Sequence, residues 1–185
     1  MQVANNPWKI ISEENIYDNP WINLTEYKVI NPSGGKGIYG KIHFKNRAIG
    51  VVAIDETDNV YLVGQYRFPV SQYSWELPEG GGPYNEDPLK AAQRELLEET
   101  GLIATEWREL MRMHLSNSVT DEEAIIYLAT GLTQHDAEPE ETEDLQTLKL
   151  PFSEVLEKVM NGEIIDAITV AAILKIALLR KQNNF

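Results

Sequence analysis

The chain has 185 residues, of which 43% are hydrophobic, so it is long enough for one domain with a substantial core. Its 16 basic and 29 acidic residues give a net charge of -13, which argues against a nucleic acid as the main partner. The absence of cysteine excludes disulfides and cysteine-ligated zinc. The most apolar stretch, residues 164–179, is too short and too charged to span a bilayer, and the first residues do not resemble a secretory signal. A soluble cytoplasmic protein without a membrane partner is therefore expected.

Strands are predicted along most of the chain. The stretches with a strand-like apolar or β-branched composition are residues 22–30, 36–44, 48–54, 60–65, 123–130 and 145–150. The third and fourth of these are expected to pair as a hairpin of a central sheet, because only a short polar turn separates them. We predict an antiparallel β extension over residues 1–45 and a second domain over residues 46–185.

Helices are predicted in the second domain, after a glycine-rich loop at residues 78–83. Asp87 is the expected N-cap of the first helix, with Pro88 at its first position and Gly101 just past its end. A second helix is expected to begin at a Ser153 cap and to end near residue 161. A last helix, capped by Asp166, is expected to reach Lys181. Strands mixed with helices predict an α/β (α+β) domain.

The first predicted helix carries three acidic side chains on one face. Glu95, Glu98 and Glu99 are spaced i, i+3 and i+4, so their carboxylates project together. Such like charges cost roughly 0.2–0.5 kcal/mol per pair. A divalent cation would reverse this cost, because Mg²⁺ prefers carboxylate oxygens. The alternative is a solvated acidic helix face, in which Arg94 pairs with Glu98.

The wider spacing around these glutamates favours a metal site. Residues 80–102 fit the pattern G-x5-E-x7-R-E-U-x-E-E-x-G-U, where U is aliphatic, and a chance match has a probability on the order of 10^-10 per starting position. The positions are filled by Gly80, Glu86, Arg94, Glu95, Leu96, Glu98, Glu99, Gly101 and Leu102. This pattern is the Nudix box, so the chain resembles the Nudix hydrolases, which cleave nucleoside diphosphates linked to another group.

The resemblance implies a Nudix fold, in which a mixed β-sheet lies between helices. It also implies Mg²⁺ as the cofactor, with Mn²⁺ as the alternative. The implied ligands are Glu95, Glu99, Glu98 as a frequent third, and the backbone carbonyl of Glu79. Glu86 and Arg94 would join the loop of the box to its helix, and Arg94 and Glu98 are also candidate catalytic residues.

Outside the box, the chain resembles the branch of ADP-ribose and nucleoside diphosphate sugar pyrophosphatases. The stretches that carry this likeness are residues 65–69, 75–81, 141–144 and 162–166. The resemblance implies that Arg67 and Arg47 bind phosphate, although each could instead form a structural ion pair. Glu141 matches the position of the general base and Glu143 a metal-ligating position, although both could be solvated charges. Trp21 would stack on the nucleobase, or pack in the core or in a dimer interface.

One position departs from this branch. Asn117 stands about sixteen residues beyond Gly101, where ADP-ribose hydrolases usually carry proline. This departure argues against a narrow ADP-ribose specificity and favours other nucleotide sugars or a broader range of them. The expected partner is a small-molecule nucleoside diphosphate sugar of the ADP-ribose, ADP-glucose or GDP-mannose type. The alternatives are a sensor that binds a nucleotide sugar without turnover and a purely structural domain.

The N-terminal β extension implies an assembly. It is too small to bury both faces of a sheet alone, and a second copy of the chain would cover it. Because relatives in the resembled branch pair in this way, we expect a homodimer in which residues 1–45 contribute to the substrate pocket of the partner.

Overall fold

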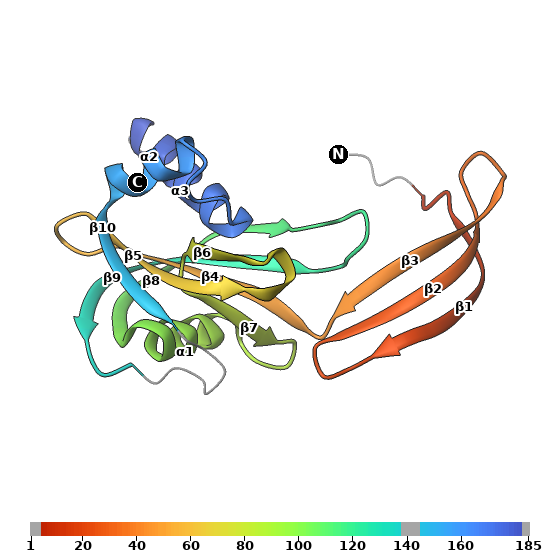
Figure 1. The fold of residues 1–185 in the computed structure, drawn as a ribbon, viewed down its shortest axis with the longest axis horizontal. Helices are drawn as coiled ribbons and strands as arrows, with labels where there is room; N and C mark the ends of the chain where they lie inside the picture. Colours follow the sequence, from red (N-terminus) through yellow and green to blue (C-terminus); the bar gives the residue numbers. More distant parts are fainter. Residues whose placement is uncertain (1–4, 138–144, 183–185) are drawn as a thin grey trace. The chain divides into compact units, whose positions relative to one another are not determined.

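The structure is a computed structural model that describes residues 5–137 and 145–182, and the chain divides into two compact units (Figure 1). The first unit holds the chain up to Asn46 together with the segment His114–Glu122. The second unit holds Arg47–Met113 and the chain from Glu123 onward. The predicted boundary after residue 45 assigns residues 114–122 to the second domain, whereas they belong to the first unit. No helix in the described residues is long and apolar enough to cross a membrane.

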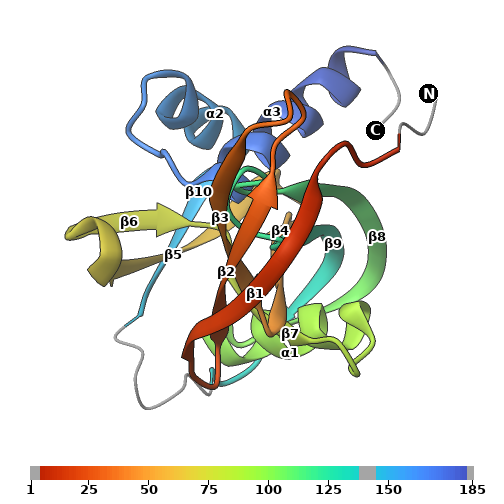
Figure 2. The ribbon, with the colours of Figure 1, turned by 90° about the vertical axis from the view of Figure 1, so that its right-hand side faces the viewer.

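The first unit is built on an antiparallel meander of three strands, which Figure 2 shows side by side. The strands are β1 (Lys9–Asp18), β2 (Ile22–Ile30) and β3 (Lys36–Phe44). The turn between β2 and β3 is set by Asn31, whose side-chain oxygen accepts hydrogen bonds from the amides of Ser33 and Gly35. The prediction of strands at residues 22–30 and 36–44 is confirmed, whereas β1 was not predicted.

The segment His114–Glu122 is hydrogen-bonded to β3. The amide of Ile42 donates to the carbonyl of Val119 (2.9 Å), and the amide of Asp121 donates to the carbonyl of Ile42 (3.2 Å). The Asp121 carboxylate accepts from the amide of Phe44 (3.1 Å) and lies 2.8 Å from Nδ1 of His43. These contacts explain why a linear boundary does not describe the first unit.

The second unit contains two sheets with the strand orders β7-β4-β9-β8 and β10-β5-β6. The strands of the first sheet are β7 (Glu79–Pro83), β4 (Asn46–Ala53), β9 (Glu123–Gln134) and β8 (Leu102–His114). Those of the second are β10 (Gln146–Pro151), β5 (Asn59–Arg67) and β6 (Gln72–Glu76). β4 and β9 pair in parallel, and β5 pairs antiparallel with both β10 and β6. The sheet structure is therefore mixed, as predicted.

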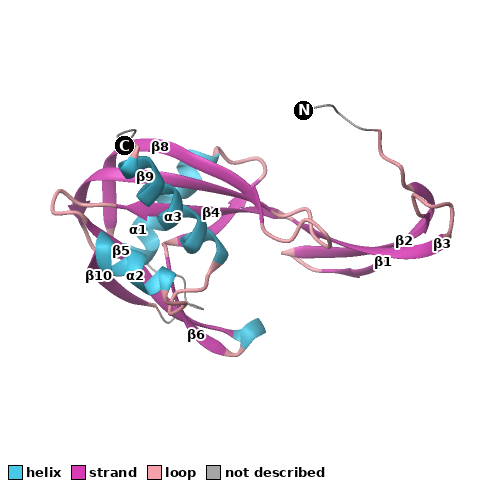
Figure 3. Ribbon diagram, turned by 90° about the horizontal axis from the view of Figure 1, so that it is seen from above, coloured by secondary structure: helices cyan, strands magenta, loops and turns pink. Residues whose placement is uncertain are grey.

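Helices cover both faces of β4. Ile49 and Val51 belong to a buried cluster with Ala92 and Leu96 of α1 (Pro88–Thr100). Gly50 points to the opposite face, where a Cβ atom would lie 2.7 Å from a methyl carbon of Ile168 in α3 (Ala167–Lys181). Figure 3 views the unit from the side of α3 and of α2 (Phe152–Met160). The predicted arrangement of a mixed sheet between helices is confirmed.

Two local predictions are wrong. The strands β4 and β5 form no hairpin and share only the bridge between Ile54 and Val60, because β4 already has β7 and β9 on its two edges. The expected glycine-rich loop at residues 78–83 is largely strand β7, which pairs with β4.

The prediction that Ser153 caps the second helix is also wrong. Helix α2 begins at Phe152, directly after Pro151, and no side chain caps it. The amide of Phe152 donates instead to the carbonyl of Asp58 (2.9 Å), while the Phe152 ring is buried. Packing and a backbone acceptor thus replace the cap.

Candidate active site

Helix α1 begins and ends as the sequence predicts. The Asp87 side chain accepts from the amide of Leu89 (2.9 Å), and Pro88 occupies the first turn. The helix ends at Gly101, whose φ of 70° lies in the left-handed region that favours glycine. These local signals fix where the acidic face of the helix begins and ends.

The acidic face of α1 is partly buried. Glu99 is 2% exposed and Glu95 is 7% exposed, whereas Glu98 is half-buried. Ionised carboxylates are rarely so buried unless they are paired or bind a cation. A solvated helix face, the alternative left open by the sequence, therefore does not describe Glu95 and Glu99. We call Glu95, Glu98 and Glu99 the box carboxylates.

The start of the box packs closely against these carboxylates. The amide of Glu79 donates to Glu99 Oε2 (2.9 Å). A Cβ atom on Gly80 would lie 2.3 Å from the carboxyl carbon of Glu95, so no other residue fits there without moving that side chain. β7 thus runs directly beside the acidic face of α1, which brings the backbone at Glu79 next to the box carboxylates.

Arg94 joins the parts of the box. Its Nη1 donates to Glu95 (2.7 Å) and to Glu98 (2.9 Å), and its Nη2 donates to the carbonyl of Gly81 (2.9 Å). Nη2 also lies 3.6 Å from Glu86. Both terminal nitrogens of this guanidinium therefore have protein partners, in an arrangement that links α1 to the preceding loop.

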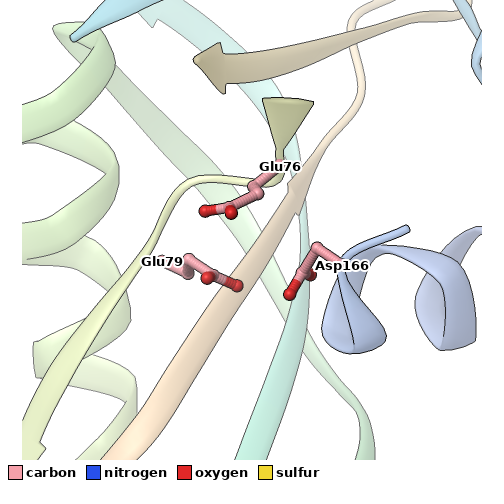
Figure 4. Close-up of side chains that lie close together, drawn as sticks. All are labelled: Glu76, Glu79 and Asp166. Atoms are coloured by element: carbon pink, nitrogen blue, oxygen red, sulfur yellow. The ribbon is translucent and has the colours of Figure 1, made fainter. Parts of the chain in front are cut away.

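A second carboxylate group lies beside the first. Glu76, Glu79 and Asp166 each offer an oxygen within 4.8 Å of the others, and Figure 4 shows them converging from the end of β6, the start of β7 and the start of α3. We call these three residues the outer carboxylates. Glu76 is 3% exposed, and Glu79 Oε2 is buried without a hydrogen-bond partner in the described residues.

Arg67 is held by two of the outer carboxylates. Its Nε and Nη2 donate to Glu76 at 3.0 Å and 2.5 Å, and Nη2 also donates to Glu79 at 2.8 Å. The ion pair that the sequence left open for Arg67 is thus present. Because Arg67 is also partly exposed, this pairing does not prevent contact with a ligand.

The site has an excess of negative charge. The six box and outer carboxylates outnumber the two guanidiniums that pair with them in the described residues, those of Arg67 and Arg94. Burial, followed by the negative charges of Asp166 and Glu76, raises the pKa of Glu79 well above its usual range. A bound cation would offset both effects. The oxygen donors and the buried, unpaired Glu79 Oε2 therefore fit a hard divalent metal ion.

The other predicted site residues lie in different surroundings. Arg47 stacks 4.5 Å from the ring centre of Tyr84 and lies 3.7 Å from Glu123, so it is engaged within the second unit. Trp21 lies in the first unit and is 67% exposed, which rules out burial in the core of the described chain. Glu141 and Glu143 lie outside the described residues.

The remaining positions of the box are structural in character. Leu96 and Leu102 are buried in the cluster beneath α1.

Two members of the site, Glu76 and Asp166, were not predicted as site residues. The signal available for both was that they lie in stretches that carry the family likeness, residues 75–81 and 162–166. Asp166 was otherwise explained by its cap, and its side chain does accept from the amide of Thr169 (2.7 Å).

Thr169 ties α3 to the segment that carries the outer carboxylates. It is fully buried, and its hydroxyl accepts from the amide of Leu77 (2.9 Å), between Glu76 and Glu79.

Replacing Thr169 by valine keeps the shape but leaves this buried amide without its acceptor, so we expect a loss of about 1–3 kcal/mol in the free energy of unfolding, measured with urea. Thr147→Val at an exposed position of β10 should change stability by less than about 0.5 kcal/mol. Equal stability of the two variants would contradict this role.

A comparison with protein families decides the identity of this fold. The family model described as the NUDIX domain matches residues 44–169, which is more than half of the chain. The chain belongs to the Nudix family. A second model, described as the nucleoside diphosphate sugar hydrolase N-terminal domain, matches residues 8–42 of this Nudix protein. Nudix hydrolases use divalent metal ions, in agreement with the donor set of the site.

Relatives and a solved structure resemble this Nudix protein over between about half and all of its length. The ADP-ribose pyrophosphatase of Mycobacterium tuberculosis is 33% identical over 94% of this chain and 85% of its own length. The GDP-mannose pyrophosphatase of Escherichia coli O1:K1 is 34% identical over 46% of this chain and 47% of its own length. A crystal structure of an ADP compounds hydrolase shares the fold, with a TM-score of 0.86, 20% identity and full coverage of both chains.

Proposed function

We propose that this Nudix protein hydrolyses the diphosphate linkage of nucleoside diphosphate sugars. The products would be a nucleoside monophosphate and a sugar phosphate. The observation that carries the proposal is a partly buried set of carboxylates, in excess over guanidiniums, beside the partly exposed Arg67. Acidic oxygens bind divalent cations, and an arginine binds phosphate oxygens, so together they suit a metal-bound diphosphate. The named relatives act on substrates of this class.

We assign the metal to Mg²⁺, with Mn²⁺ as the alternative. Glu95, Glu99 and the backbone carbonyl of Glu79 would hold it, with Glu98 as a further ligand. When bound, the metal would neutralise phosphate oxygens and acidify the attacking water. Arg67 would bind and orient the diphosphate, and Glu141 would take the proton from the water. We also propose that the protein is cytoplasmic, as expected from its sequence.

A panel of substrates tests the proposal. ADP-ribose, ADP-glucose and GDP-mannose would be supplied at equal concentration with Mg²⁺ and a phosphatase, which releases phosphate only from the monoester products. We expect release from more than one of them, because Asn117 departs from the proline of narrow ADP-ribose hydrolases. Binding of these compounds without any phosphate release would favour the sensor alternative, and neither binding nor release would overturn the substrate class.

We further propose that two copies pair through the first unit. Its three-stranded sheet leaves many apolar side chains exposed, including Ile10, Ile11, Tyr17, Trp21 and Ile38. A small sheet with apolar side chains on its surface is stabilised by a second surface. Light scattering is expected to give twice the 21.0 kDa mass of the chain. A single species of the chain mass would contradict the pairing.

Subunit complementation tests whether the first unit serves the site of the partner. If Trp21 of one copy contributes to the pocket of the other, Trp21→Ala and Glu99→Gln chains are each deficient alone. A mixed dimer then contains one intact site, so co-expression is expected to restore about a quarter of the wild-type activity if pairing is random. No recovery in a mixture shown to contain mixed dimers would place Trp21 at its own site or at none.

A further inference from the structure

The guanidinium of Arg67 is fixed along one edge. Nε and Nη2, the two nitrogens of that edge, donate to both oxygens of Glu76, and Nη2 donates to Glu79 as well. Both partners are well anchored, since Glu76 is 3% exposed and the Glu79 side chain is 12% exposed. A planar guanidinium that is bound to two carboxylates on one edge has little freedom to rotate.

The other end of the same guanidinium has no such partner. Among the described residues, none accepts a hydrogen bond from Arg67 Nη1, and the side chain is 37% exposed. Arg94 differs, because both of its terminal nitrogens donate to the protein. Of these two arginines, only Arg67 therefore presents a terminal nitrogen with both of its hydrogens available to a ligand.

Glu79 connects this arginine to the box. Its backbone amide donates to Glu99, one of the box carboxylates, while its side chain accepts from Arg67. The negative charge of the Glu79 carboxylate would repel an anionic substrate, so we expect this side chain to have a role that outweighs the repulsion. Orienting the phosphate-binding arginine relative to the metal ligands is such a role, because an unconstrained arginine would have to be ordered when substrate binds.

We propose that Glu79, together with Glu76, is a positioning residue that aims Nη1 of Arg67 at the diphosphate of the substrate. The inference rests on the proposed function, because the diphosphate is the group that Arg67 would meet. It assigns a role to the side chain of Glu79, in addition to the role of its backbone carbonyl. Glu79 acts through Arg67 and does not itself touch the substrate.

A double-mutant cycle tests this inference. Glu79→Leu removes the acceptor for Nη2, Glu79→Gln keeps an oxygen acceptor, and Arg67→Lys keeps the positive charge beside buried Glu76 but removes the planar fork. We expect Glu79→Leu to raise KM for ADP-ribose about 10-fold, with kcat changed less than about 3-fold, and Glu79→Gln to raise KM less than about 3-fold. In the Arg67→Lys background, Glu79→Leu should change KM by less than about 2-fold.

A second measurement separates this inference from the proposed function. The affinity for methylenediphosphonate with Mg²⁺, measured by calorimetry, should follow the same cycle, because this probe carries the two phosphorus groups but cannot be hydrolysed. This affinity tests the positioning role of Glu79 even if the protein hydrolyses no nucleotide sugar. An equal loss of affinity from Glu79→Leu in both backgrounds would overturn the inference, as would a loss from Glu79→Gln as large as that from Glu79→Leu.

Folding is checked by circular dichroism and thermal unfolding of each variant. If Glu79→Leu does not fold, Glu76→Gln takes its place in the cycle. Arg67 donates to both oxygens of Glu76, and glutamine offers only one acceptor there. We expect Glu76→Gln to weaken the affinity for methylenediphosphonate in the wild-type background and not in the Arg67→Lys background. Loss in both backgrounds would again overturn the inference.

Discussion

Replacement of Glu99 by glutamine is expected to lower kcat by more than about 100-fold while the protein stays folded. Loss of a group that only supports a metal ligand commonly costs about 10–100-fold, so loss of a ligand should cost more. Glutamine keeps an oxygen that can accept from the amide of Glu79, as Glu99 does at 2.9 Å, but it removes one charge from the site. Steady-state kinetics with Mg²⁺ and a thermal unfolding curve measure the two parts of this prediction.

Two controls belong to this experiment. Glu157→Gln on the exposed side of α2 removes the same charge far along the chain and should leave kcat within about 2-fold. A chelator should abolish the activity of the wild-type protein, and added Mg²⁺ should restore it. Wild-type rates from Glu99→Gln in the presence of Mg²⁺ would show that the metal is held elsewhere.

The box could be predicted because its signals are local. Asp87, Pro88 and Gly101 define helix α1 through caps that depend on neighbouring residues only. The spacing of Glu95 and Glu99 then places their carboxylates on one face, whatever the rest of the fold does. What the spacing could not predict was their burial, because this depends on β7 packing beside the helix, with Gly80 against Glu95.

The outer carboxylates could not be predicted in this way. Glu76 and Asp166 are ninety residues apart, and no signal in the sequence indicated that they meet, because Glu76 stood out only within the stretch 75–81 that carries the family likeness and Asp166 was predicted as a helix cap. They meet because α3 packs on β4, where Gly50 leaves room for Ile168, and because Thr169 binds the amide of Leu77. Such convergence depends on tertiary packing, which no periodicity in the sequence reports. The separation of β4 and β5 into two sheets likewise depends on tertiary packing, although the turn residues between them suggested a hairpin.

The choice of general base follows from how the carboxylates of the site are bound. Each box or outer carboxylate in the described residues accepts a hydrogen bond from the protein: Glu95 and Glu98 from Arg94, Glu76 and Glu79 from Arg67, Glu99 from the amide of Glu79, and Asp166 from the amide of Thr169. A general base must lie within hydrogen-bond reach of the attacking water, whereas these carboxylates are already held by protein donors. This favours a base outside the set, and the resemblance to the pyrophosphatase branch assigns it to Glu141, which lies outside the described residues.

Replacement of Glu141 by glutamine is accordingly expected to lower kcat by about 10²–10⁴-fold and to leave KM roughly unchanged, because a base contributes to the transition state and not to substrate binding. The rise of kcat with pH that reports the base should disappear in this variant. Glu143→Gln is the matched comparison, since it removes the same charge two residues away and should instead raise the Mg²⁺ concentration required for activity. If only Glu143→Gln abolishes the pH dependence, that residue is the base; if neither variant does, the base belongs to the box, where half-buried Glu98 is the next candidate.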